Sequence, residues 1–511
     1  MLASLSSCGL NGIDGFHVTV EVNLAMGMPM FEIVGLPDAS VKESRERVRA
    51  ALKNSGFEYP NGRITVNLAP ADLKKEGPAY DLSIALGLLA CRGTIDADAL
   101  KDCCIIGELS LDGGVRSVRG ALPMVIFARS RGMKRMLLPT ENLAEVSCIE
   151  GIELLGVSSL LQAARHLRGE ESIAPAETAE YRELLSRRSF PVDFSHVKGQ
   201  KSAKRALEIA AAGGHNVLMI GPPGSGKTLM ARCMPTILPD MTFDEALETT
   251  RIHSVAGIVP PTGLLTERPF RSPHHTASHA SLVGGGTNAL PGEISKAHNG
   301  VLFLDELPEY RRDVLEALRQ PLEDGFVTIT RVSAQSTYPS EFVLVGSMNP
   351  CPCGNLGSRI RPCRCTPSAI RRYLNRVSGP LLDRIDMHIE VESIPAERLA
   401  QDAPEESSDA IRSRVEAARE VQRRRYANEA GNIRINAQLS ARDLNAACRT
   451  TPEAHDLLML SCEKLRLSNR AYTRILKVAR TIADLEGHDK IQAEHISEAV
   501  QYRTLDRKYW G

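Results

Sequence analysis

Eight consecutive residues, 221–228 (GPPGSGKT), have the types and the spacing of a loop that binds phosphate groups. A largely apolar run at 215–220 precedes them and a helix-like segment at 229–232 follows, which is the strand–turn–helix context that the motif requires. Glycines let the backbone curl, so that successive N–H groups and the helix N-terminus point at a polyphosphate. Lys227 then reaches the β- and γ-phosphates, and the Thr228 hydroxyl coordinates Mg²⁺. The predicted nucleotide-binding residues are therefore Gly221, Pro222, Pro223, Gly224, Ser225, Gly226, Lys227 and Thr228.

A second motif supports the first. Residues 301–304 (VLFL) are apolar and are followed by Asp305 and Glu306, the pattern of a buried parallel strand whose carboxyl end faces a nucleotide. At such an edge Asp305 would hold the Mg²⁺, and Glu306 would orient and deprotonate the attacking water. The alternative interpretation of residues 221–228 is a glycine turn that happens to precede a Lys-Thr pair. That interpretation gives no reason for a strand ending in two carboxylates elsewhere in the chain. The two motifs together predict ATP hydrolysis.

Composition sets the frame for these motifs. A chain of 511 residues is too long for one hydrophobic core, so we expect roughly two to four domains. Lys and Arg (62 together) balance Asp and Glu (62 together), so any contact with nucleic acid has to be local. The first residues lack a basic segment followed by an apolar core, and no apolar run is long enough to span a bilayer. We therefore expect a cytoplasmic protein without a membrane partner, whose cysteines are thiols or metal ligands.

Changes in pattern along the chain predict its domains. Strand-like alternation at 18–22 and 63–67, with a helix-like segment at 38–53 between them, favours an α+β or α/β domain at the amino end. A charged, helix-prone stretch beyond it is typical of a linker. The expected parts are an N-terminal domain (1–169), a linker (170–190), the nucleotide-binding core (191–395) and a helical lid (396–511).

Two segments of the N-terminal domain resemble the proteolytic domain of Lon-type proteases, namely KKEGPAYD at 74–81 and GELSL at 107–111 with the following 115–120. That family uses a Ser–Lys dyad with the serine directly after the Gly-Pro pair. Here Ala79 stands in that place, and Met124 stands where the lysine belongs. Because such a mechanism needs a nucleophile and a base, the resemblance implies a Lon-like fold without peptidase chemistry. The alternative is a generic α+β domain with a chance match.

The segments between the two nucleotide motifs are long and specific: RPFRSPHH at 268–275, SLVGGG at 281–286, PGEI at 291–294 and AHNG at 297–300. They resemble the magnesium-chelatase-like AAA+ group, and in particular the ComM/YifB family. The resemblance implies an α/β core, a parallel sheet with helices on both faces, plus a helical lid. It also implies an insert at 279–294 and a hairpin whose arms run over 326–332 and 338–346. Val197 and Gly199 would line the adenine pocket.

The same resemblance assigns three further catalytic residues. Asn349, after the apolar run 342–346, takes the role of the sensor that hydrogen-bonds the γ-phosphate or the attacking water. Arg384, in GPLLDRID at 379–386, matches the arginine finger, which reaches the ATP of the neighbouring subunit and so implies a hexameric ring. Arg470 matches the second sensor, with Arg474 one helical turn later as the runner-up. Both of these arginines could instead be surface cations.

Three arginines are candidates for DNA binding. Arg331 lies near the expected hairpin tip, where the resemblance implies contact with DNA in the pore of the ring; the alternative is a solvent-facing arginine. Arg371 and Arg372 belong to a local concentration of arginines that fits contact with a phosphate backbone. An ion-paired surface between subunits would have the same composition.

Four cysteines form a Cys-x-Cys pair, a nine-residue gap and a second Cys-x-Cys pair. Four thiolates within so short a span resemble a tetrahedral zinc site, although each pair is closer than in the usual Cys-x-x-Cys knuckle, and reduced loop thiols are the alternative. His274, His275 and His279 are expected to form a polar loop and not a second metal site. The candidate zinc ligands are Cys351, Cys353, Cys363 and Cys365.

The resemblance implies an ATP-driven, hexameric DNA motor that promotes DNA translocation and branch migration in recombination or DNA uptake. Its cofactors would be ATP and Mg²⁺, with structural Zn²⁺ at the cysteines, and its partners DNA, further copies of the chain and recombination proteins. The alternative is a magnesium-chelatase-type motor subunit that drives metal insertion or remodels a partner protein. A Lon-like protease is disfavoured because the dyad is absent.

Overall fold

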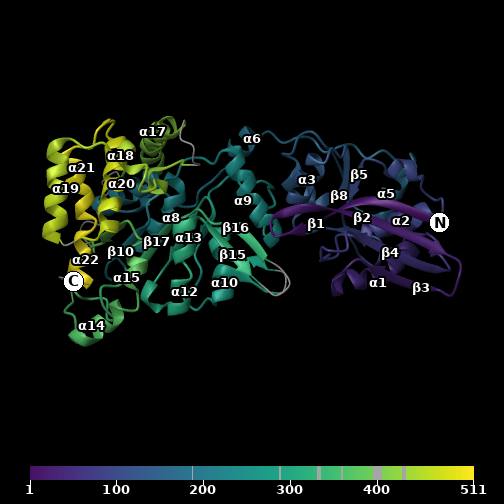
Figure 1. Ribbon diagram of the computed structural model, residues 1–511, viewed down its shortest axis with the longest axis horizontal. Coiled ribbons are helices and arrows are strands. Elements are labelled where there is room, and N and C mark those ends of the chain that lie inside the picture. Colours follow the sequence, from purple (N-terminus) through teal and green to yellow (C-terminus); the bar gives the residue numbers. More distant parts are fainter. Residues whose placement is uncertain are drawn as a thin grey trace.

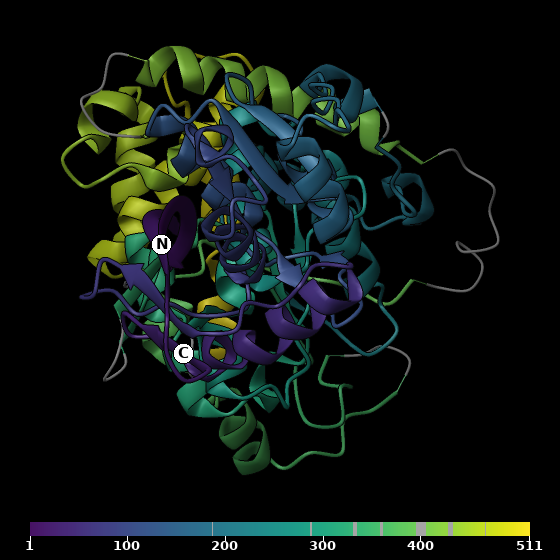
Figure 2. The ribbon, with the colours of Figure 1, turned by 90° about the vertical axis from the view of Figure 1, so that its right-hand side faces the viewer.

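The computed structural model describes residues 1–186, 188–286, 289–330, 335–357, 361–394, 405–427, 433–465 and 467–510. Figure 1 shows an elongated molecule with the N-terminal domain at one end, the nucleotide-binding core in the middle and the C-terminal helices at the other end. In the view along the long axis the N-terminal domain lies in front of the core (Figure 2). No helix within the described residues is both long and apolar enough to cross a membrane.

The N-terminal domain is built on a mixed seven-stranded sheet in the order β3-β4-β2-β1-β5-β8-β9. Alternation places Val18, Val20 and Val22 in the core on one face of β2. The expected strands at 18–22 and 63–67 are confirmed, as is the helix at 38–53, whose N-terminus is capped by the Asp38 carboxylate. The strands are β1 Leu2–Asn11, β2 Asp14–Ala25, β3 Met30–Val34, β4 Arg63–Ala69, β5 Cys103–Ile105, β6 Glu108–Leu109, β7 Val115–Arg116, β8 Arg135–Pro139 and β9 Glu153–Val157. The helices are α1 Ala39–Asn54, α2 Asp81–Cys91, α3 Ala121–Ser130, α4 Leu143–Val146 and α5 Leu160–Leu167.

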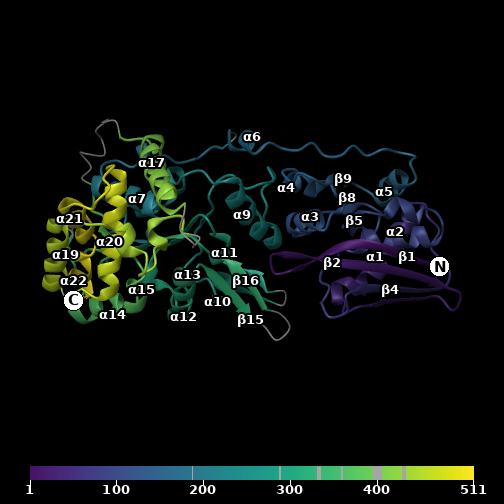
Figure 3. The ribbon, with the colours of Figure 1, turned by 45° about the horizontal axis from the view of Figure 1, so that its top comes forward.

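The segment between this domain and the core contains one short helix, α6 Tyr181–Ser186, and runs along the side of the molecule (Figure 3). The Tyr181 hydroxyl donates to the carbonyl of Met241 at 2.6 Å. Arg188 forms an ion pair with Asp240 at 2.6 Å. These contacts hold the linker against the core.

The core is a five-stranded sheet in the order β11-β14-β17-β10-β18, with every neighbouring pair parallel. Its central strands are buried throughout because helices cover both faces, as expected for a parallel sheet. The expected α/β core is confirmed. The strands are β10 Val217–Ile220, β11 Phe270–Arg271, β14 Val301–Leu304, β17 Val343–Met348 and β18 Met387–Glu390. The helices are α7 Lys201–Gly213, α8 Lys227–Ile237, α9 Phe243–Ala256, α12 Arg312–Glu316, α13 Arg319–Asp324, α14 Pro367–Leu374 and α15 Gly379–Leu382.

Two small hairpins project from the core. The insert consists of α10 His279–Val283, β12 Gly284–Gly285, β13 Leu290–Pro291 and α11 Glu293–Lys296. The second hairpin pairs β15 Phe326–Thr330 with β16 Gln335–Pro339 in antiparallel register. The expected return arm at 338–346 was wrong, because β16 alternates between exposed and buried residues whereas β17 is buried at every position. Residues buried on both faces suit a central strand, not a hairpin. Arg331 lies outside the described residues.

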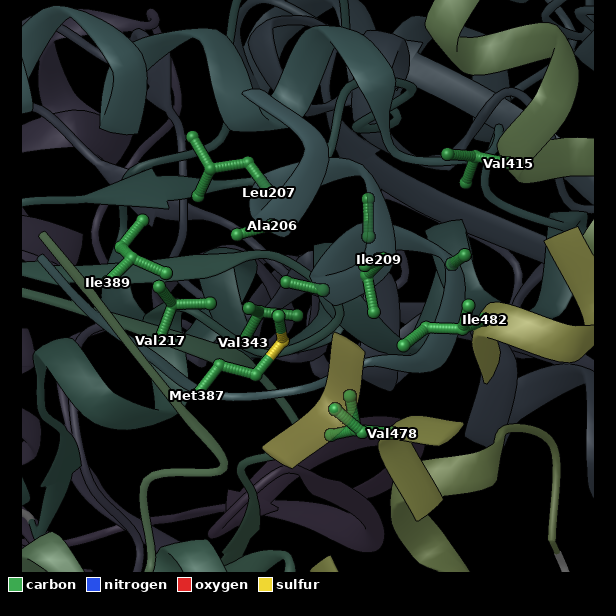
Figure 4. Packing of buried hydrophobic residues seen from close by; sticks show 14 of the residues in the cluster. Ala206, Leu207, Ile209, Val217, Val343, Met387, Ile389, Val415, Val478 and Ile482 are labelled. Atoms are coloured by element: carbon green, nitrogen blue, oxygen red, sulfur yellow. The ribbon is translucent and has the colours of Figure 1, made fainter. Parts of the chain in front are cut away.

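The C-terminal helices pack on the core and share its hydrophobic interior. Figure 4 shows Val415 and Ile482 from these helices on the side of the cluster where Ile209 of α7 lies, and Val478 belongs to the same cluster. The long helices expected in the lid are confirmed. They are α17 Ser408–Tyr426, α18 Leu444–Ala447, α19 Pro452–Leu465, α20 Asn469–Leu485, α21 Ala493–Gln501 and α22 Thr504–Trp510.

The N-terminal domain docks on the core through α3 and α9. Val125 packs in one apolar cluster with Ala246 and Leu264 of the core, and Arg251 pairs with Asp14 across the interface at 2.6 Å. Beside this contact lies a cavity of about 880 Å³ whose lining includes Ala79, Met124 and the hairpin residue Tyr338. The two positions where a Lon-type dyad would stand therefore share one cavity but carry no nucleophile or base.

Candidate ATP site

The phosphate loop leaves the end of β10 and enters α8, as predicted. Gly226 stands at the N-cap of α8 with φ +88°, in the left-handed region that glycine adopts without strain. At Gly221 an added Cβ would lie 2.3 Å from the carbonyl oxygen of Val391, so only glycine fits there. These constraints explain why the loop needs glycine at these two positions.

The side chain of Lys227 is buried inside this loop. Its Nζ donates to the carbonyl oxygens of Gly221 and Pro222, both at 2.8 Å. Burial lowers the pKa of Lys227, against the opposing influence of Asp305 and Glu306. A polyphosphate at the loop would favour the charged form of this lysine, so the site suits an anionic ligand.

Oxygen atoms suited to Mg²⁺ converge next to the loop. The Thr228 hydroxyl donates to Asp305 Oδ2 at 2.9 Å, and the Ser347 hydroxyl donates to Asp305 Oδ1. Hydroxyl and carboxylate oxygens are the ligands that Mg²⁺ prefers, so these residues fit the ion. Ser347 was not predicted; its only signal in the sequence is a polar residue within the apolar run before Asn349.

Glu306 has a strained backbone at the edge of the same site. Its φ is +52°, a left-handed conformation that costs a non-glycine residue free energy and is often found at functional positions. Its side chain is 56% exposed, and His275 Nδ1 lies 3.6 Å from Glu306 Oε2. His275, expected only as part of a polar loop, thus lies beside Glu306 although the two residues are far apart in the chain.

One cavity brings the predicted phosphate-site residues together. It measures about 370 Å³ and is lined by the phosphate loop from Pro223 onward, by Asp305 and Glu306, and by Asn349. The strand order explains why these residues lie together. Strand β17 lies between β10 and β14, so the carboxyl ends of the three parallel strands are side by side. With the Lys227 ammonium and loop N–H groups for phosphates, and the Asp305 carboxylate for a metal ion, the cavity suits a nucleoside triphosphate with Mg²⁺.

Neither Val197 nor Gly199, the residues predicted for the adenine pocket, is among the described lining residues of this cavity. Val197 is buried, and the Gly199 N–H donates to Glu405 Oε1 at 2.6 Å. The next residue, Gln200, makes the contact with the phosphate loop, because its side-chain amide donates to the carbonyl of Ser225 at 3.3 Å. Gln200 was missed because nothing in its local sequence distinguishes it.

Arg384 and Arg470 lie at the opposite edge of the sheet. They line a second cavity of about 630 Å³, together with residues that precede the core strands, such as Asn216 and Phe342. Arg384 pairs with Glu323 at 2.5 Å and donates to the Pro380 carbonyl at 2.6 Å. Within one chain the two arginines therefore face away from the phosphate loop.

Arg474 differs from Arg470 in having a buried partner. Its guanidinium pairs with Asp386, which directly precedes β18. Burial alone would raise the pKa of Asp386, but Arg474 and His215 outweigh it and hold that pKa well below its usual range. The pair ties α20 to the sheet, so Arg474 is a residue of the lid interface and Arg470 remains the candidate sensor.

This difference predicts two distinct phenotypes. Arg474→Ala leaves Asp386 buried without its cation and should destabilise the protein by about 3–5 kcal/mol. Arg470→Ala should leave the melting temperature unchanged while ATP turnover falls. Differential scanning calorimetry and steady-state ATPase assays on both variants provide the comparison. Equal loss of stability in the two variants would contradict the assignment of Arg470.

The four cysteines predicted as zinc ligands come together in the loop after Asn349. Cys351 Sγ lies 3.4 Å from Cys353 Sγ and 3.7 Å from Cys363 Sγ, and all four sulfur atoms, including that of Cys365, lie within 4.8 Å of one another. Cys351 is buried and the other three are half-buried. Four sulfur atoms at this spacing could hold one metal ion.

The remaining predicted basic residues have separate locations. Arg371 and Arg372 are exposed on α14, the helix that follows the cysteine loop. Neither of them lines the described part of the ATP-site cavity, so a role for them would involve a partner at the surface.

Comparison with known proteins agrees with this architecture. Residues 193–399 match the family model described as magnesium chelatase, subunit ChlI, and residues 405–503 match the model of the ChlI C-terminal region. Residues 20–142 match the model described as subunit ChlI of Mg-chelatase.

Two curated relatives cover almost the whole chain. The chain is 44% identical to protein YifB of Escherichia coli, over 97% of this chain and 96% of YifB. It is also 44% identical to competence protein ComM of Haemophilus influenzae, over 99% of this chain and 98% of ComM. The 67 kDa magnesium-chelatase subunit of Chlorobaculum parvum is 27% identical over only 31% of the chain. With a parallel core sheet, a phosphate loop and this similarity along its full length, the chain belongs to the ComM/YifB family of magnesium-chelatase-like AAA+ proteins.

Proposed function

We propose that this protein is an ATP-driven motor that acts on DNA as a hexameric ring and promotes branch migration during recombination or DNA uptake. The observation that carries the ATPase part is the single cavity in which the phosphate loop, Asp305, Glu306 and Asn349 meet. Lys227 and Thr228 would bind the phosphates and Mg²⁺, which neutralises developing charge on the phosphoryl group. Asp305 would hold the ion, and Glu306 would accept the proton of the attacking water.

The ring is supported by the positions of the two arginines. A phosphoryl-transfer site benefits greatly from an arginine that reaches the transition state, but Arg384 and Arg470 lie at the edge of the sheet opposite the phosphate loop. A second copy that presents this edge to the phosphate loop of the first would supply both arginines. Repeated head to tail, this contact is heterologous, and such contacts form a ring when the rotation between copies closes.

The DNA part of the proposal is supported by the relative named competence protein and by two surface features. The hairpin β15–β16 projects from the core, and α14 exposes Arg371 and Arg372. We expect the hairpin and the two arginines to contact the phosphate backbone of DNA and not to read the bases. Binding should therefore depend on salt more than on DNA sequence.

A single assay separates the proposed function from its alternative. The basal ATPase rate is measured without DNA, with single-stranded DNA and with a branched duplex, at two salt concentrations. Stimulation by DNA that weakens at higher salt supports the DNA motor. No stimulation by any DNA would leave the ATPase intact but favour a motor that remodels a partner protein, as the match to chelatase subunit models suggests.

Replacement of Arg331 tests the hairpin. Arg331→Ala should keep the basal ATPase rate and ring assembly but lose DNA stimulation, because one cation per subunit no longer contacts phosphate. The salt dependence of DNA binding should flatten by about one phosphate contact for each engaged subunit. Arg331→Lys, which keeps the charge, serves as the matched control. Normal junction migration by the alanine variant would exclude Arg331 and direct attention to Arg371 and Arg372.

A further inference from the structure

The four sulfur atoms in the loop after Asn349 lie within 4.8 Å of one another, with Cys351 Sγ and Cys353 Sγ 3.4 Å apart, a spacing close to that of a tetrahedral metal site. Zinc–thiolate bonds of about 2.3 Å place sulfur atoms about 3.8 Å apart, and Cys363 Sγ lies 3.7 Å from both Cys351 Sγ and Cys353 Sγ. The N–H of Cys365 also donates to Cys363 Sγ at 3.4 Å. Such donation to the ligand atoms is typical of the surroundings of a bound metal.

Other cysteines of the chain show what thiols without a metal look like here. Cys233 and Cys448 are buried singly in the apolar core. Cys8 and Cys104 touch each other at 3.3 Å, but only as a pair. Among the described residues, a group of four sulfur atoms occurs at this one place. If all four were ionised, these sulfur atoms would repel one another unless a cation lay between them.

The loop that these cysteines form packs directly against the ATP site. Gly354, with φ +75°, donates its N–H to the carbonyl of Cys351 at 2.9 Å. A Cβ added at Gly354 would lie 2.6 Å from Cδ of Pro223 and 3.9 Å from Cγ of Asn349. Gly354 therefore packs closely against Pro223 of the phosphate loop, and the side chain of Asn349 lies next to the same position.

We propose that Cys351, Cys353, Cys363 and Cys365 bind one Zn²⁺, and that this zinc loop positions Asn349 against the phosphate loop for ATP hydrolysis. The second half of this statement rests on the ATPase function proposed above; the first half does not. Cys351 follows Asn349 by two residues, so fixing its sulfur atom limits how far the amide can move. A displacement of about 1 Å in a positioning group can cost about 100-fold in rate. The cysteines act through Asn349 and are positioning residues.

Metal analysis tests the site itself, without ATP or DNA. The purified full chain should contain about one zinc ion per chain, and Cys351→Ser combined with Cys363→Ser should remove it. Cys462→Ser, which changes a half-buried thiol on α19, is the matched control and should keep the zinc. Replacement of zinc by Co²⁺ should give the charge-transfer and intense visible bands of a tetrahedral thiolate site. A chain that contains no zinc and takes up neither metal would overturn the proposal.

Kinetics test the positioning role. Removal of zinc should lower kcat for basal ATP hydrolysis by about 10- to 100-fold, while the Kd for ATP stays close to that of the wild type because the phosphate loop is intact. The effect should not add to that of Asn349→Ala, since both changes act on the same amide. Unchanged kcat after loss of zinc, or full additivity with Asn349→Ala, would reject the positioning role.

Two further measurements guard against simple misfolding. Zinc extracted from the wild-type chain with a chelator and then restored should return kcat, which an unfolded protein would not do. Gly354→Ala keeps all four thiols but pushes a methyl group against Pro223 and strains the left-handed backbone. It should retain zinc and still lose kcat. If loss of zinc lowers the basal ATPase rate but DNA does not stimulate it, the positioning role of the zinc loop is supported and the proposed DNA motor function is rejected.

Discussion

Replacement of Arg384 by alanine is expected to lower ATP turnover by about 10³- to 10⁵-fold, the range by which arginine fingers accelerate phosphoryl transfer. Arg384 is held by Glu323 and the Pro380 carbonyl at the edge of the sheet opposite the phosphate loop. Its effect on turnover must therefore come through a neighbouring subunit. ATP binding to each chain should persist because the phosphate loop is untouched, and nucleotide titrations with steady-state assays measure both quantities.

Mixing variants tests the transfer between subunits. Arg384→Ala chains keep Glu306, and Glu306→Gln chains keep Arg384, so a mixed ring contains interfaces with both groups intact. In a random equal mixture these are about one quarter of the interfaces in a head-to-tail ring, and turnover should recover accordingly. Arg423→Ala, which removes an exposed arginine paired with Glu420 on the lid, is the control and should change nothing. Absence of recovery when subunits exchange freely would contradict a finger supplied by the neighbour.

Replacement of Glu306 by glutamine is expected to lower kcat by about 10²- to 10⁴-fold, the usual contribution of a general base. Glutamine has nearly the same shape and the same backbone requirement at φ +52°, so the melting temperature should not change. The Kd for ATP with Mg²⁺ should also be retained, because Thr228 and Asp305 are unaffected. Rapid-quench measurement of single turnovers separates slow chemistry from slow product release.

A nearby carboxylate supplies the control for this prediction. Glu309 lies three residues after Glu306 and pairs with Arg376 at 2.7 Å. Glu309→Gln removes a charge from the same segment, but Glu309 is not among the described residues that line the ATP-site cavity. The kcat of this variant should therefore remain near that of the wild type. Comparable losses in both variants would mean that general electrostatics of the segment, and not proton transfer at Glu306, controls the rate.

The elements that sequence predicted correctly depend on neighbouring residues. The phosphate loop follows a buried strand and precedes a helix, and residues 301–304 form the strand that ends at Asp305. The helix at 38–53 begins at its Asp38 cap. In each case the hydrophobic period and the capping or glycine residues lie within one short segment, so local sequence is sufficient.

The errors and omissions concern residues whose role depends on distant parts of the chain. The family resemblance implied a return arm at 338–346, but this range runs from the end of β16 into β17. Burial on both faces, which assigns β17 to the central sheet, is a property of the fold. His275 beside Glu306 and Gln200 beside Ser225 likewise join segments that local patterns do not connect.

For this protein, sequence alone determined the family resemblance, the candidate groups for phosphate and Mg²⁺, and the cysteine set, because these depend on residue types at fixed spacing. Tertiary structure decided which of these groups meet. The parallel order β14-β17-β10 brings Asp305, Asn349 and the phosphate loop to one edge of the sheet. The same order leaves Arg384 and Arg470 at the other edge, and the buried partner Asp386 distinguishes Arg474 from Arg470. Strand order and burial arise from packing over the whole chain, and no single segment encodes them.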